Sequence, residues 1–142
     1  MTIKRSFNVI LPWPHRGLSP NSRINFHAKA QLFKATKDQA CLLTKKALLD
    51  HQIGRVKPIL DDHSKHFGKR GGTVNVQLIC TPPTNRYRDE DNMIALCKAV
   101  IDGISSAIQV DDCCFHYREQ VWFPAKQGKL GSLEVVCDWE EE

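Results

Sequence analysis

The sequence has no long hydrophobic run and no N-terminal segment that resembles a signal peptide. Both absences limit the classes of protein to which it can belong. No apolar stretch approaches the roughly 20 residues that a membrane-spanning helix requires. The apolar run near the N-terminus is short and has no small-residue cleavage site, so we expect no signal peptide.

The sequence also lacks any C-x-x-C pair, a spacing typical of zinc and redox sites. Its 142 residues, 42% of them hydrophobic, suffice for a core that needs no disulfide framework. We therefore expect a cytoplasmic protein with reduced cysteines that act mostly as small core residues, and no zinc site. The six cysteines are Cys41, Cys80, Cys97, Cys113, Cys114 and Cys137.

The net charge of +4 conceals a division between the two halves of the chain. Residues 1–75 carry 14 Lys and Arg against 4 Asp and Glu, whereas residues 76–142 carry 6 against 12. A basic surface for a polyanion beside a separate acidic site would produce this division. A solvated basic helix and an acidic tail would produce it too, so charge alone leaves nucleic-acid binding open.

Apolar periodicity predicts one small α+β domain over residues 1–142. The order β-α-β-α-β-β is typical of helices packed on a mixed sheet. Residues 55–72 match neither pattern and are interpreted as a loop insertion, and the turn at 126–129 predicts that the last two strands form a hairpin. The predicted strands are 3–11, 73–81, about 114–123 and 132–138, and the predicted helices are 26–53 and 92–108.

Each predicted helix has apolar residues at three- and four-residue spacings, which should face the sheet. Gly54 is expected to stop the first helix. The expected buried face of the first helix contains Phe26, Ala30, Phe33, Ala40, Leu43, Ala47 and Leu48. That of the second contains Ile94, Cys97, Ile101, Ile104 and Ile108.

Two acidic residues, Asp89 and Asp91, stand two positions apart at the end of a polar loop. An extended backbone there would point both carboxylates the same way. Asp91 or Asn92 is also a natural N-cap for the helix that follows, and capping is the simpler interpretation. A helix N-cap needs only one acidic residue, so capping does not explain why both Asp89 and Asp91 are present. The neighbouring Arg86 and Arg88 would either bind phosphate or balance the acids.

A second acidic pair, Asp111 and Asp112, follows the same predicted helix. A helix of about 17 residues is roughly 25 Å long, so acids at its two ends could share a metal only if the chain turned back. Two separate turns with ordinary Asx chemistry are the alternative, and the spacing leaves both open. Three convergent carboxylates would suit Mg²⁺, a hard cation that prefers oxygen ligands.

Five short motifs follow one another along nearly the whole chain. They are Leu11–Pro14 (L-P-W-P), Leu18–Arg23, Arg88–Met93 (R-D-x-D-N-M), Lys98–Ile104 and Val110–Asp112. Each is weak alone, but R-D-x-D-N followed about twenty residues later by D-D, with L-P-W-P at the start, is specific. With these motifs the chain resembles the RusA family of Holliday-junction resolvases, especially the longer forms carried by phages and prophages.

The resemblance implies a dimeric, Mg²⁺-dependent endonuclease in the cytoplasm of a bacterial host, with Mn²⁺ as a substitute metal. Such an enzyme makes paired symmetric nicks in four-way junctions during DNA recombination and repair. The family's essential acids match Asp89, Asp91 and Asp112, its supporting acid matches Asp111, and its catalytic lysine matches Lys98. The resemblance also implies that the chain turns back to bring Asp112 beside the first two acids.

Lys98 departs from the short members of the family, because it lies seven residues after Asp91 instead of four. In a helix, a spacing of four and a spacing of seven residues both place the lysine on nearly the same face as the aspartate. The longer spacing moves the lysine about 4.5 Å further along the helix axis. Asp102, one turn further on, has no partner that the sequence indicates.

The candidate DNA-binding residues come from three segments of the chain. Trp13, between two prolines, is interpreted either as a core residue or as a base-stacking wedge. Lysines in the predicted hairpin turn are either solvated or follow the DNA backbone. The candidates are Trp13, Arg16, Arg86, Arg88, Lys126 and Lys129.

A protein that binds junctions or other branched DNA without cutting it is the alternative function. The intact set of acids argues against it, because binding alone gains nothing from carboxylates that face phosphate. A regulatory DNA-binding domain would need a recognition helix rich in Arg, Asn and Gln, which residues 92–108 lack. The motifs do not separate four-way junctions from forks or flaps as substrates.

Overall fold

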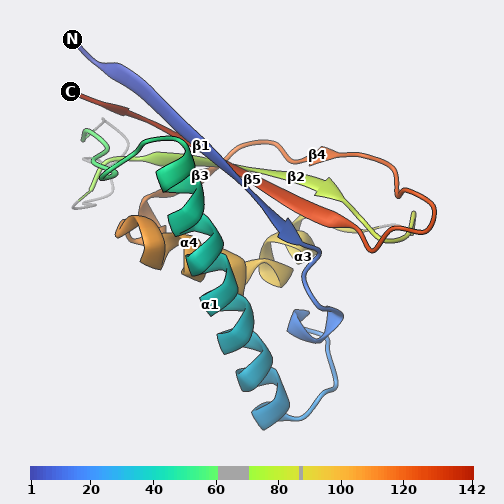
Figure 1. Ribbon diagram of the computed structural model, residues 1–142. Helices are drawn as coiled ribbons and strands as arrows, with labels where there is room; N and C mark the ends of the chain where they lie inside the picture. The colour runs from blue at the N-terminus through green and yellow to red at the C-terminus, as the bar shows by residue number, and fades with distance from the viewer. Residues whose placement is uncertain (61–70, 87) are drawn as a thin grey trace.

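A mixed sheet lies against a layer of helices, as Figure 1 shows. The computed structural model describes residues 1–60, 71–86 and 88–142. Its elements are β1 (Ile3–Pro12), η1 (Arg16–Leu18), α1 (Phe26–Asp50), β2 (Val74–Thr81), α3 (Glu90–Leu96), α4 (Lys98–Ile108), η2 (Asp112–Cys114), β3 (Phe115–Tyr117), β4 (Val121–Trp122) and β5 (Ser132–Glu141). The predicted α+β class is confirmed.

The two ends of the chain form neighbouring strands of the sheet. β5 is antiparallel to β1 on one side, with Ile3 opposite Glu141, and antiparallel to β2 on the other. The short strands β3 and β4 then pair in succession with the free side of β2, both in parallel. Both termini therefore lie at the same end of the sheet (Figure 1).

Alternate residues of the three long strands face the helices and form the core. In β2 these residues are Val74, Val76 and Leu78, as predicted, and each is at most 2% exposed. The residues between them are only partly buried, which is expected where helices cover one face of a sheet. The rings of Phe7 on β1 and Trp139 on β5 meet edge-on at 5.9 Å.

The helix layer is closest where α1 crosses α4 at Gly103. A Cβ atom there would clash with the carbonyl oxygen of Lys37 and would lie 2.7 Å from the Cβ of Ala40. The apolar face predicted for the second helix is confirmed, since its residues are buried except for Ile94, which packs partly buried at the edge of the core.

Only the second half of α1 packs as predicted. Ala40 and Ala47 are buried against the core, but Phe26 is 80% exposed and Ala30 is exposed as well. The first turns of the helix project beyond the sheet (Figure 1), so no sheet residue is available to cover them. The helix also ends before Gly54, at Asp50.

The remaining differences from the predicted elements lie after β2. The helix predicted for 92–108 begins at Glu90 and is divided at Cys97 into α3 and α4. The strand predicted for about 114–123 is divided into β3 and β4. The turn at 126–129 is present, but the hairpin is wrong, because β4 pairs with β2 while β5 pairs with β1 and β2.

Residues 61–70 of the predicted insertion lie outside the described residues. Residues 54–60 have no helix or strand, and the N–H of Ile59 donates to the carbonyl oxygen of Glu140 at 2.9 Å. All six cysteines are free thiols, and four are buried as expected: Cys80, Cys97, Cys114 and Cys137. No helix in the described part of the chain is long and apolar enough to cross a bilayer.

Candidate functional site

Asp89 is the N-cap of α3. Its backbone is extended (φ −88°, ψ 137°), and its Oδ1 accepts a hydrogen bond from the N–H of Asp91 at 2.9 Å. Because α3 begins at Glu90, Asp91 lies in the first helical turn. The backbone is thus extended at Asp89 but helical at Asp91, and the N-cap expected at Asp91 or Asn92 is wrong. The carboxylates of Asp89 and Asp91 are exposed.

The chain reverses its direction directly after α4. Gln109 ends the helix in the left-handed conformation (φ 57°, ψ 38°), and Ser105 Oγ donates to the carbonyl oxygen of Val110 at 2.7 Å. Asp111 then caps η2 by accepting a 3.0 Å hydrogen bond from the N–H of Cys113. That hydrogen bond is the main cause that holds the pKa of Asp111 below its usual value.

The reversal brings Asp112 to Lys98, at the start of α4. Lys98 Nζ lies 2.7 Å from Asp112 Oδ2 and 3.0 Å from Asp102 Oδ1. The hydrogen bond to Asp112, followed by that to Asp102, raises the pKa of Lys98, so the amine is protonated at neutral pH. We call Lys98, Asp102 and Asp112 the acid–lysine cluster. The chain therefore turns back as far as the start of α4, while Asp89 and Asp111 each accept the local hydrogen bond of the alternative interpretation, two separate Asx turns.

Two residues near this site were not expected from the sequence. Asp102 is the second carboxylate on Lys98, although the i,i+4 spacing of the pair was a signal that could have indicated it. Tyr117, on β3, lies near enough for the charges of Asp112, Lys98 and Asp102 to act on it. Burial and then the charge of Asp112 raise the pKa of Tyr117 to about 12, so its phenol stays protonated as a hydrogen-bond donor.

The four predicted metal ligands fit Mg²⁺ in their chemistry but are not gathered around one point. Asp89, Asp91, Asp111 and Asp112 all offer carboxylate oxygens that solvent reaches. Within residues 1–60, 71–86 and 88–142, no three acidic, His or Cys side chains stand close enough together to hold one ion. Lys98 occupies one oxygen of Asp112. The joint metal site therefore stays a prediction.

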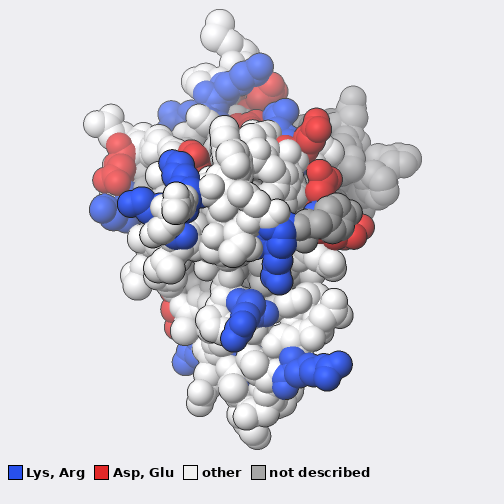
Figure 2. All heavy atoms as spheres, turned by 90° about the vertical axis from the view of Figure 1, so that its right-hand side faces the viewer, with Lys and Arg blue, Asp and Glu red and all other residues white. Residues whose placement is uncertain are grey.

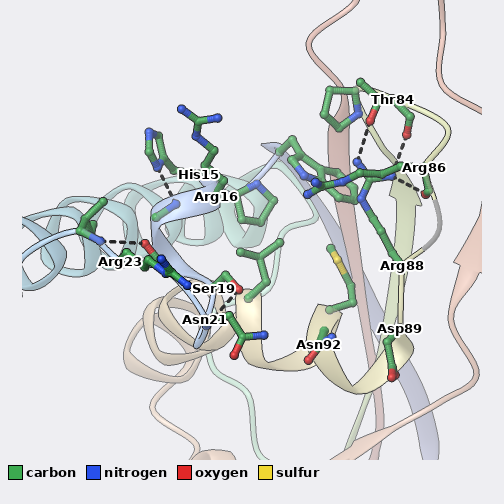
Figure 3. A pocket seen from close by; sticks show the side chains of 18 residues that line it. His15, Arg16, Ser19, Asn21, Arg23, Thr84, Arg86, Arg88, Asp89 and Asn92 are labelled. Atoms are coloured by element: carbon green, nitrogen blue, oxygen red, sulfur yellow. Dashed lines mark hydrogen bonds between the residues drawn. The ribbon is translucent and has the colours of Figure 1, made fainter.

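A groove of about 1420 Å³ lies between the β1–α1 connection and the start of α3. Figure 3 shows Arg16 and Arg23 on one wall, Arg86 and Arg88 across from them, and Asp89 at the edge of the second wall. We call it the arginine groove, defined by these five residues and Trp13. Four arginines against one carboxylate give it a positive potential that attracts anions.

Arg88 forms hydrogen bonds to the loop in which it lies. Its Nη1 donates to the carbonyl oxygens of Thr84 and Arg86 at 2.7 and 3.1 Å, and its Nη2 donates to Thr84 Oγ1 at 3.1 Å. The guanidinium also lies 5.5 Å from the centre of a Trp13 ring, and Trp13 in turn meets Trp122 edge-on at 6.2 Å. These contacts fix the guanidinium of Arg88 against its own loop and against Trp13.

The last two candidates, Lys126 and Lys129, are exposed in the β4–β5 connection and do not line the groove. The N–H of the adjacent Ala125 donates to Asn85 Oδ1 at 2.7 Å, which joins this connection to the loop of Arg86. Figure 2 shows Lys and Arg side chains spaced down one face of the molecule, with acidic side chains mainly in its upper half.

Comparison with known proteins assigns no activity to this site. No protein-family model matches the chain. A protein of Xylella fastidiosa (strain Temecula1 / ATCC 700964), described as an uncharacterized protein, is 28% identical over 110 residues. The matched segment covers 78% of this chain and 63% of that protein, so the chain spans less than two thirds of the length of this relative.

Proposed function

We propose that the protein is a Mg²⁺-dependent endonuclease of the RusA type, which cuts four-way junctions or other branched DNA in the cytoplasm of a bacterial host. Asp89, Asp91 and Asp112 are its proposed catalytic acids, and Lys98 is its catalytic cation. The observation that carries the proposal is the 2.7 Å contact between Lys98 and Asp112. It joins two residues, 14 positions apart, that the resemblance assigns to one site.

Lys98 would act on phosphate as a positive charge. Its raised pKa keeps the amine protonated at neutral pH, so the side chain is a cation or a proton donor and not a general base. A cation held in place stabilises the negative charge that develops on phosphate or leaving oxygens. Asp102 limits the movement of the ammonium through its own 3.0 Å contact.

The remaining roles in the proposal follow from charge. A bound Mg²⁺ would supply an activated water and neutralise phosphate, and its ligands would be Asp89, Asp91 and Asp112 with Asp111 in support. The guanidinium groups of Arg86 and Arg88 stand on the same groove as Asp89 and would bind phosphate oxygens beside it.

Cleavage of defined DNA structures tests the proposal. A synthetic four-way junction, a fork and a matched duplex are labelled on each strand in turn and incubated with Mg²⁺, Mn²⁺ or EDTA. We expect paired, symmetric nicks in the junction with either metal, none in EDTA, and an intact duplex. A junction that stayed intact in both metals, at protein concentrations that saturate binding, would refute the proposal.

Binding of branched DNA without cleavage is the second candidate function. It is favoured by the arginine groove together with the lack, among the described residues, of a gathered three-ligand metal group. It predicts that the junction is bound equally well in Mg²⁺ and in EDTA and that no product forms in either, so the same experiment distinguishes the two candidates.

A further inference from the structure

Three guanidinium groups on the walls of the arginine groove have no protein partner among the described residues. Arg16 and Arg23 belong to the β1–α1 connection, and Arg86 belongs to the loop before α3. None of them forms an ion pair or a side-chain hydrogen bond within the described chain. Unpaired arginines that face one hollow from two separate segments are arranged to bind a ligand with several negative charges.

The wall formed by the β1–α1 connection is held by contacts within the chain. His15 Nδ1 accepts a hydrogen bond from the N–H of Gly17 at 2.9 Å, and Lys29 Nζ donates to the carbonyl oxygen of Ser19 at 2.9 Å. Gly17 is packed so closely that a Cβ atom there would lie 2.9 Å from the side chain of Ile24. A wall that is ordered before binding reduces the entropy lost when a ligand binds.

Apolar side chains lie between the arginines and give the groove a second kind of surface. They include Trp13, Ile24 and Leu96. A DNA duplex presents its phosphates to such a surface but hides the faces of its bases. An unpaired strand presents both, and single-strand binding sites combine a basic groove with aromatic side chains on which bases stack. The groove volume of about 1420 Å³ also exceeds that of ordinary small-molecule sites, roughly 300–1,000 Å³.

We propose that the arginine groove binds an unpaired stretch of DNA strand, with phosphates on Arg16, Arg23 and Arg86 and a base against Trp13. This inference rests on the proposed function, because Asp89 stands on the same groove and the bound strand would lead towards the catalytic acids. The ligand is a strand whose base pairs have opened at a branch point, so the groove would recognise branched DNA by its unpaired bases.

Binding of a short oligothymidylate tests the inference without cleavage. A labelled strand of about 12 nucleotides is titrated with the full chain in EDTA and followed by fluorescence anisotropy at several salt concentrations. We expect Arg23→Gln to weaken binding about tenfold and to reduce the salt slope of log K by about 0.7. The matched control is Lys46→Gln, which removes one charge from an exposed position of α1 outside the groove and should leave both quantities unchanged.

A second variant separates base contact from phosphate contact. Trp13→Leu should weaken oligothymidylate binding while leaving the salt slope unchanged, because a stacked base carries no phosphate charge. Thermal unfolding of both variants shows whether the fold is intact. An Arg23→Gln protein that is folded and binds like Lys46→Gln would overturn the inference.

Two further comparisons decide the ligand and keep the inference distinct from the nuclease proposal. Thymidine monophosphate should not displace the labelled strand at equal nucleotide concentration, and a matched duplex should bind more weakly than the single strand. Displacement by the mononucleotide, or equal binding of the duplex, would overturn the unpaired-strand assignment even if junctions are cut. Groove binding that depends on Arg23, in a protein that cuts no junction, would support the inference and refute the nuclease.

Discussion

At the scale of single residues, the acid–lysine cluster is exposed enough for its chemistry to be altered without loss of the fold. Asp112→Asn removes a proposed metal ligand and one partner of Lys98. Since exposed ion pairs contribute about 1 kcal/mol or less, the variant should remain folded. We expect it to leave a junction uncut in Mg²⁺ and to bind the junction in EDTA at least as tightly as the parent, because one negative charge near phosphate is lost.

Cleavage gels and anisotropy measure these two properties of Asp112→Asn. The control is Asp38→Asn, which makes the same chemical change at an exposed position of α1. Cleavage by Asp112→Asn at a rate close to that of Asp38→Asn would show that Asp112 is not part of the catalytic machinery.

Buried thiols give the folded state a dependence on alkaline pH. Burial raises the pKa of Cys80 and Cys137 from 9.0 to about 12. Between these values the unfolded chain has released protons that the folded chain retains, so the free energy of unfolding falls as pH rises. We expect the urea midpoint, followed by tryptophan fluorescence, to be steady below pH 9 and to decrease from there towards pH 12.

The variant Cys80→Ala provides the comparison for this pH dependence. It should unfold at lower urea than the parent at neutral pH, because the smaller side chain leaves a cavity. Its midpoint should then decline less steeply above pH 9, since one buried thiol no longer ionises on unfolding. Identical alkaline slopes for the two proteins would show that Cys80 does not contribute in this way.

The sequence predicted Lys98 and Asp112 as site residues, but it predicted neither Asp102 nor the arrangement of the three. The contact between Lys98 and Asp112 depends on a reversal at Gln109, which adopts a left-handed conformation that glutamine rarely takes. No local propensity indicates such a turn, and only the resemblance implied it. The N-cap at Asp89 was missed because three neighbouring polar residues can all cap a helix.

At the scale of elements, the crossing of α1 and α4 depends on the missing side chain of Gly103. Alanine normally favours a helix over glycine by about 1 kcal/mol. Here its Cβ would meet the backbone of α1 at Lys37 and Cys41, which cannot move without separating the helices. We expect Gly103→Ala to destabilise the protein by about 1–3 kcal/mol, seen as a lower urea midpoint.

Gly54→Ala is the matched control for Gly103→Ala. A Cβ at Gly54 has no atom within 4 Å, and its φ is not positive, so alanine should be neutral or stabilise by up to about 1 kcal/mol. A Gly103→Ala protein as stable as Gly54→Ala would mean that the two helices adjust at no cost.

The periodicity of apolar residues predicted which helices form, but not how much of each helix packs against the sheet. The core face of α4 follows from its apolar spacing, whereas the same spacing in α1 continues past the end of the sheet, where Phe26 is exposed. The turn at 126–129 formed as expected, but turn chemistry is local and does not select a strand's partner. β5 pairs with β1 and β2 instead, over far longer stretches than the two residues of β4 could offer.

At the scale of the whole molecule, the proposed reaction needs a second copy of the chain. Resolution of a four-way junction requires two nicks, and the described chain holds a single acid–lysine cluster. A two-fold dimer would supply two clusters related by the symmetry of the junction itself. Surface is available for the contact, since β1 forms one edge of the sheet and exposes Ile10, and α1 exposes Phe26 and Leu42.

We therefore expect light scattering to give twice the mass of one chain at micromolar protein. Mixed dimers of parent and Asp91→Asn chains should nick one strand of a junction and then stall, because only one of their two sites can act. Mixed dimers of parent and Asp38→Asn chains, which keep both sites intact, should make both nicks. A protein that scatters as a monomer and still makes paired, symmetric nicks would contradict the dimer. In that case one cluster would have to act twice on the same junction before dissociating.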